Sequence, residues 1–250
     1  ETIVLPLNDT EALKQAFEQF KEEVAAVIIE GIPANNGLLM QDEAYLEFLQ
    51  NICKENKSLL IFDEVITGFR LGFEGAAAHY GIKPDIVTYG KIIGGGLPVG
   101  MYGASAEIMA HISPDGGVYQ AGTLSGNPVA MAAGIAQLTE LLRSGFYKEL
   151  NTKATEFAES IKRFAAARNY KVKVFHIGSI FWIAFTDKDK IRSAADIDHS
   201  SMEKFKVMHR ELLNRGIYLG PSGYEVGFVS AAHTKIELEK AKRAIFESLD

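Results

Sequence analysis

The sequence has few cysteines, no long apolar run and no excess of basic residues. Cys53 is the only cysteine among 250 residues, which excludes an internal disulfide and an all-cysteine metal site and fits a reducing compartment. No apolar run reaches the roughly 18 residues of a membrane-spanning helix. The net charge of -6, without a dense Lys/Arg tract, argues against nucleic-acid binding. We therefore expect a cytoplasmic protein with neither a nucleic-acid nor a membrane partner.

Cys53 lies in a helical apolar pattern over residues 45–53, so we interpret it as a small buried hydrophobe rather than a reactive thiol. Residue 1 is Glu, and residues 2–7 have the character of an internal stretch of a longer sequence. We expect the chain to be a fragment or a processed product.

The first part of the chain alternates helical patterns with short apolar runs. Apolar runs at residues 24–29 and 59–62 are typical of strands buried on both faces, and a third strand is expected at residues 85–89. A helical pattern follows the N-cap candidates Asn8 and Asp9, and others cover residues 42–56 and 127–142. A short helix follows the glycine-rich residues 68–75. This alternation predicts an α/β fold with a mostly parallel central sheet.

From about residue 147 the pattern changes. A long amphipathic helix precedes two strands, a further helix, a strand pair and a last helix, expected at residues 172–175, 180–185, 202–214, 217–230 and from 235 onward. Residues 187–201 are polar and predict an exposed loop. We expect a large domain over residues 1–145 and a small C-terminal α/β domain over residues 146–250.

Charged residues follow three predicted strands, where ligands bind in open α/β sheets. Glu30 follows the first strand and is either a site residue or a charge at the exit to solvent. Asp63 follows four apolar residues, so its carboxylate is expected to be partly desolvated and to need a cationic partner. A protonated pyridine nitrogen or the guanidinium of Arg70 can supply that cation.

Lys91 follows the third strand between apolar residues and the glycines 94–96. Burial there lowers the pKa of a lysine and makes its neutral amine available for a Schiff base. The competing interpretation is an anion-binding lysine of a phosphate loop, but the sequence Gly-x-x-x-x-Gly-Lys-Ser/Thr is absent.

Residues 119–128 combine hydroxyl groups, backbone amides and a helix start, the components of an anion site. The simpler interpretation is a loop that ends in the N-cap Asn127, and both can hold together.

These segments together resemble the class III, fold-type I, pyridoxal-phosphate aminotransferases. The resemblance is carried by residues 60–70, 84–85, 90–100 and 118–128, and it resumes at residues 215–219, 221–222 and 229–234. It implies pyridoxal 5'-phosphate as cofactor, with a pyridoxamine form in the cycle, and a homodimer that shares its active site across the interface. It also implies an N-terminal part with a phosphate loop and a ring-stacking aromatic residue, which this chain does not contain.

The resemblance further implies a role for each matching residue. Lys91 would bind the cofactor covalently and move protons, Asp63 would pair with the pyridine nitrogen, and Val65 would pack on the ring. Thr123 would bind the cofactor phosphate of the partner subunit. No metal is implied.

Residues 221–230 correspond to the region in which transaminases usually carry an arginine for the carboxylate of 2-oxoglutarate. This chain has no arginine there, and Glu225 places a negative charge instead. This favours an aminomutase, which moves an amino group within one amino-aldehyde and needs no second keto acid. The alternatives are an ω- or β-amino-acid transaminase and a catalytically silent binding protein of the same fold. For Glu225 the competing interpretation is a plain surface turn.

Overall fold

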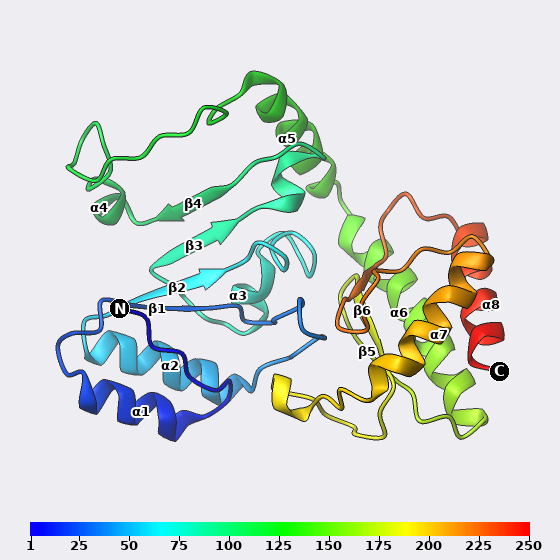
Figure 1. Cartoon of the computed structure of the whole chain (residues 1–250). Coiled ribbons are helices and arrows are strands. Elements are labelled where there is room, and N and C mark those ends of the chain that lie inside the picture. The colour runs from blue at the N-terminus through cyan, green and yellow to red at the C-terminus, as the bar shows by residue number, and fades with distance from the viewer. The chain divides into compact units, whose positions relative to one another are not determined.

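The computed structural model describes residues 1–250. The chain forms two compact units. The first comprises Glu1–Gly31 and Gln41–Phe146, and the second comprises Ile32–Met40 and Tyr147–Asp250 (Figure 1). The sequence pattern had assigned residues 32–40 to the first domain, whereas the structure packs them with the C-terminal residues. No helix is both long and apolar enough to cross a membrane.

The first unit is built on a four-stranded sheet in the order β1-β2-β3-β4. β1 pairs with β2 and β2 with β3 in parallel, and β4 joins β3 antiparallel. The α/β fold with a mostly parallel sheet is therefore confirmed. Its elements are α1 (Thr10–Gln19), β1 (Ala26–Ile29), α2 (Glu43–Glu55), β2 (Leu59–Asp63), α3 (Gly75–His79), β3 (Ile86–Tyr89), the 3-10 turn η1 (Lys91–Gly94), β4 (Met101–Ala104), α4 (Ala106–Met109) and α5 (Pro128–Leu141).

Helices α1 and α2 lie against each other below the sheet in the view of Figure 1, and α2 packs on β2. Of the two predicted N-cap candidates, Asp9 caps α1, its side chain accepting a hydrogen bond of 2.9 Å from the Ala12 amide. Cys53 is buried on α2, as predicted. Burial, followed by the nearby Asp85 carboxylate, raises the pKa of its thiol to about 12, which leaves it unreactive.

The strands of this sheet are only partly buried, so the prediction of strands buried on both faces is wrong for this chain. Leu60 and Phe62 of β2 are fully buried, whereas the intervening Ile61 is half-buried. On β1, Ile28 has 64% of its surface exposed. Because neighbouring side chains of a strand point to opposite faces, the helices of this unit bury alternate residues.

The second unit combines helices with a small antiparallel sheet in the order β5-β6-β7. Its elements are α6 (Phe146–Ala167), β5 (Lys173–Ile177), β6 (Ile180–Ala184), the 3-10 turn η2 (Ala194–Asp196), α7 (Ser201–Asn214), β7 (Gly227–Phe228) and α8 (Lys235–Leu249). The strand pair expected over residues 217–230 is wrong, because only the two residues of β7 form a strand. Gly220, Pro221 and Gly223 favour turns in the remainder.

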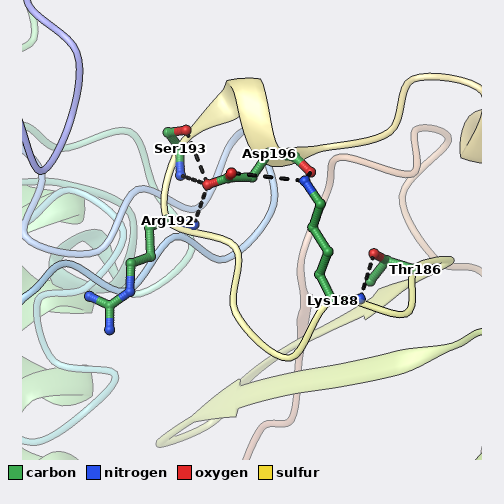
Figure 2. A network of polar contacts seen from close by, with 5 residues as sticks. All are labelled: Thr186, Lys188, Arg192, Ser193 and Asp196. Atoms are coloured by element: carbon green, nitrogen blue, oxygen red, sulfur yellow. Dashed lines mark hydrogen bonds and ion pairs between the residues drawn. The ribbon is translucent and has the colours of Figure 1, made fainter.

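The loop between β6 and α7 is organised by its own polar contacts (Figure 2). The Asp196 carboxylate accepts hydrogen bonds from the Arg192 amide (3.1 Å), the Ser193 amide (3.1 Å) and the Ser193 hydroxyl (3.2 Å). Lys188 Nζ donates to the Asp196 carbonyl at 2.6 Å. The predicted loop is thus present, and η2 forms a capped turn within it.

Candidate active site

Two of the three charged residues at strand ends meet at one edge of the first unit's sheet. Asp63 is the last residue of β2, and Lys91 follows β3 after a single glycine. The register places Asp63 beside Thr88, three residues before Lys91. β2 and β3 run parallel, so their carboxyl ends form a common edge at which ligands bind in sheets of this type.

The Asp63 carboxylate is half-buried, as its position after an apolar strand predicted. Its Oδ1 accepts a hydrogen bond of 2.9 Å from the Val65 amide. Asp63 has no ion pair with Arg70 or with another cation of the chain, so the alternative of a structural Asp63–Arg70 pair is not supported. The second carboxylate oxygen has no hydrogen-bond donor and can accept one from a ligand.

Val65 joins Asp63 to the turn that carries Lys91. A Cβ atom added to Gly90 would lie 3.2 Å from Val65 Cγ1, closer than ordinary van der Waals contact. Gly90 therefore lets the Lys91 turn approach Val65. The Asp63 carboxylate, the Val65 side chain and the turn that carries Lys91 thus lie at one edge. A carboxylate, an apolar side chain and a primary amine are the groups that suit the pyridine nitrogen, the ring and the aldehyde of pyridoxal phosphate.

Lys91 opens η1 with a φ of 48°, in the left-handed region that non-glycine residues rarely occupy. Such backbone strain is concentrated at functional sites. The side chain is exposed, so the prediction of a buried lysine is wrong for this chain. Its turn packs on α5 through Ile93 and Gly94, which are buried, whereas Lys91 at the start of η1 is left exposed.

Glu64 is a site neighbour that the sequence analysis missed. Its carboxylate is buried and accepts hydrogen bonds from the Thr67 hydroxyl, the Ala76 amide (3.0 Å) and the Ala77 amide (2.6 Å). Burial raises its pKa, and these three hydrogen bonds oppose that rise. Glu64 thus ties the backbone beside Asp63 to the start of α3. The signal was a second carboxylate in an apolar segment, but its donors lie up to 13 residues away.

The loop at residues 119–128 is exposed and ends at the start of α5. Asn127 caps the helix, accepting hydrogen bonds from the Val129 amide (3.1 Å) and the Ala130 amide (3.2 Å), as the sequence predicted. Thr123 is exposed in this loop. Its neighbours Gly122 and Leu124 line a cavity of about 620 Å³, together with residues of β4 and α5.

Glu225 lies in the second unit, on an exposed turn. Its carboxylate covers Gly220, where an added Cβ atom would overlap it. The turn is held by the Trp182 indole, which donates to the Gly223 carbonyl at 2.8 Å, and by the Tyr224 carbonyl, which accepts from the Gly37 amide at 2.7 Å. The turn is therefore fixed by buried contacts, while the carboxylate itself stays accessible.

Comparison with known proteins gives consistent results for almost the whole chain. A family model described as "Aminotransferase class-III" matches residues 3–245. A glutamate-1-semialdehyde 2,1-aminomutase of Psychrobacter sp. is 44% identical over 246 residues, which are 97% of this chain. The chain spans 57% of the length of that relative.

Solved structures resemble this one closely. An ω-transaminase from Sphaerobacter thermophilus superimposes with a TM-score of 0.91 at 31% identity, over 99% of this chain and 56% of that protein. A glutamate-1-semialdehyde aminomutase from Pseudomonas aeruginosa, solved in complex with PMP, gives a TM-score of 0.86 at 25% identity. That match covers 99% of this chain and 56% of the aminomutase.

Proposed function

The chain belongs to the class III aminotransferase family, and from this membership we propose that the protein is an aminomutase, an isomerase that converts glutamate-1-semialdehyde to 5-aminolevulinate for tetrapyrrole (porphyrin) biosynthesis. The observation that carries the proposal is the meeting of Asp63, Val65 and the Lys91 turn at one sheet edge. The 44% identity to a curated aminomutase supports the choice of reaction.

The cofactor of the proposed enzyme is pyridoxal 5'-phosphate, which withdraws electrons from the substrate carbon when its pyridine nitrogen is protonated. The Asp63 carboxylate would accept a hydrogen bond from the protonated pyridine nitrogen, and Val65 would pack on the ring face. Lys91 Nζ would bind the cofactor covalently and would move protons at the reacting carbons. Thr123 would bind the cofactor phosphate of the partner subunit.

Glu225 selects the substrate in this proposal. A negative charge at this turn repels a dicarboxylate such as 2-oxoglutarate, and residues 221–230 contain no arginine that attracts one. An amino group that stays within one substrate needs no such co-substrate. The accessible carboxylate on a fixed turn agrees with a direct role toward the substrate.

We further propose that the protein is a cytoplasmic homodimer, with residues 1–145, apart from the segment 32–40 that packs in the second unit, in the cofactor-binding domain and residues 146–250 in the small domain. Support for a second copy comes from α5, where Val129 and Ile135 each have 67% of their surface exposed. Exposed apolar groups of this kind mark protein interfaces. They lie next to the loop of Thr123, which would contact the partner's cofactor.

A transaminase for ω- or β-amino acids is the second candidate, favoured by the TM-score of 0.91 to an ω-transaminase. The two reactions differ in their need for a second amino or keto acid. A catalytically silent protein is the third candidate, and the joint presence of Asp63, Val65 and Lys91 speaks against it.

The test uses the complete protein, supplied with pyridoxal phosphate. Borohydride reduction followed by peptide mass analysis is expected to find the cofactor on Lys91, and Lys91→Ala is expected to lose this label. Glutamate-1-semialdehyde is then expected to yield 5-aminolevulinate without any keto acid. Turnover only with an added amino or keto acid would establish the transaminase, and an unlabelled Lys91 would leave the silent protein.

A further inference from the structure

Thr88 on β3 carries a buried hydroxyl without a hydrogen-bond partner. Its Oγ1 is enclosed by the protein and meets neither a donor nor an acceptor. Its carbonyl accepts a hydrogen bond of 2.9 Å from the Glu64 amide. A buried hydroxyl that remains unpaired is costly, and such groups in native proteins have partners supplied by protein, water or ligand.

The position of Thr88 identifies the missing partner. Thr88 and Asp63 are register partners on parallel neighbouring strands, so their side chains project from the same face of the sheet. Asp63 uses one oxygen for the Val65 amide, and its other oxygen has no donor from the chain. A hydroxyl that lacks an acceptor thus lies beside a carboxylate with one oxygen that lacks a donor.

We propose that Thr88 is a positioning residue that acts through Asp63, its hydroxyl donating a hydrogen bond to the Asp63 carboxylate when a pyridinium is bound there. This inference rests on the proposed function. The hydrogen bond fixes the orientation of the carboxylate and favours its ionised form, which the protonated pyridine nitrogen requires. Thr88 touches neither the substrate nor the cofactor in this arrangement.

The proposal predicts opposite effects of one substitution on the two states of the protein. Thr88→Val keeps the shape of the side chain and removes the hydroxyl. Without cofactor, the urea midpoint of the variant is expected to equal or exceed that of the wild type, because an unpaired buried hydroxyl is lost. With cofactor, its dissociation constant for pyridoxal phosphate is expected to rise about tenfold.

Two further variants serve as controls. Thr88→Ser retains the hydroxyl and is expected to restore the cofactor affinity of the wild type. Thr139→Val removes a hydroxyl on α5 that donates to the Ile135 carbonyl at 2.7 Å, and it is expected to leave the affinity unchanged. A structural role of Thr88 alone would instead lower the urea midpoint of the cofactor-free protein.

A double-mutant cycle with Asp63→Asn tests the route of the effect. If Thr88 acts through Asp63, Thr88→Val has no further effect on cofactor affinity in the Asp63→Asn background. An equal loss in both backgrounds would mean that the hydroxyl meets the cofactor directly and would overturn the inference. Wild-type affinity in Thr88→Val would overturn it while leaving the proposed function intact. A wild-type protein that binds no pyridoxal phosphate would overturn both.

Discussion

Glu64 shows how one residue beside the candidate site carries local stability. Three donors converge on its buried carboxylate, two of them amides at the start of α3. Glu64→Ala leaves these donors without an acceptor and is expected to lower the free energy of unfolding by about 3 kcal/mol. Urea denaturation at neutral pH measures the loss, and a change below about 1 kcal/mol would contradict this account.

The pH dependence of Glu64 follows from the direction of its shift. Burial raises its pKa in the folded protein above the ordinary value of 4.5. The favourable contribution of the protonated form is therefore complete below that value and is lost as the pH rises through the folded pKa. Glu64→Gln stays neutral and is expected to lack this decline. Parallel stability curves of the two proteins between pH 4 and 8 would exclude it.

For single residues, the sequence predicted burial where the neighbours in the chain determine it. The half-buried state of Asp63 and the buried Cys53 follow from their neighbours in the chain, because apolar residues at strand or helix spacing surround each of them. The exposure of Lys91 does not follow, because it depends on which segments cover the sheet. The orphan hydroxyl of Thr88 became visible only with the strand register.

Among the elements, η1 and α5 are joined by a close backbone contact at glycines. A Cβ atom added to Gly134 of α5 would overlap the Ile93 carbonyl of η1, and one added to Gly95 would overlap the Ala133 carbonyl. Gly95 also has a φ of 57°, which suits glycine. The turn that begins at Lys91 is therefore held against α5 by two glycines.

This contact reverses the usual effect of a glycine-to-alanine change in a helix. Gly134→Ala improves helix propensity by about 1 kcal/mol, but the overlap with η1 is expected to produce a net loss of about 1–2 kcal/mol. Ala136→Gly, at an exposed position of the same helix, is the matched control and is expected to cost about 1 kcal/mol through propensity alone. Thermal unfolding of both variants measures the difference. A Gly134→Ala variant more stable than the wild type would show that η1 moves to accommodate the added methyl group.

The loop around η2 is expected to depend on the charge of Asp196. The Arg192 amide, followed by Ser193, holds the pKa of Asp196 below its ordinary value of 3.8. Its contribution is therefore present above that value and is lost as the pH falls through the folded pKa. Asp196→Asn removes the charge at every pH and is expected to speed hydrogen exchange of the Arg192 and Ser193 amides about fivefold.

The matched control for this loop is Asp187→Asn. Asp187 forms an exposed ion pair of 3.7 Å with Lys171, and such pairs contribute little to the stability of the fold. The rate of amide hydrogen exchange at residues 192 and 193, measured by mass spectrometry, is expected to stay unchanged in the control. Equal rates in the two variants would remove Asp196 as the organising group.

Elements with strong local signals were predicted well. Asp9, Asn127 and the apolar periodicity of α6 determine helices that the structure contains. β4 and α4 were not predicted, because they are only four residues long and largely exposed. The expected strand pair at residues 217–230 was wrong because turn residues interrupt it. The union of residues 32–40 with the second unit depends on Trp182 and Tyr224, which are distant in sequence.

At the scale of the whole molecule, the main feature that sequence patterns did not predict is the exposure of apolar residues on the strands. Long apolar runs were interpreted as strands buried on both faces, yet Ile28 is 64% exposed. A pattern reports which residues a strand can bury, whereas the covering segment determines which ones it does bury. The chain spans 57% of the length of its Psychrobacter relative. In this chain the apolar pattern of the strands and their actual burial differ.

The exposed face of α5 provides a test of the proposed homodimer. Ile135 is 67% exposed and lines the 620 Å³ cavity next to the loop of Thr123. In a dimer that buries this face, Ile135→Glu places an unpaired charge in an apolar interface and is expected to raise the dimer dissociation constant by at least about tenfold.

Light scattering coupled to size-exclusion chromatography of the complete protein, over a range of concentrations, measures the change in mass. Val207→Glu alters an apolar residue of α7 that is 52% exposed and is expected to leave the mass unchanged. An Ile135→Glu variant that remains dimeric at the lowest concentration would contradict the use of this face. If both variants become monomeric, the effect is one of added charge rather than of α5. Loss of the dimer in Ile135→Glu alone would place the partner subunit on α5, beside the loop in which Thr123 is proposed to bind its cofactor.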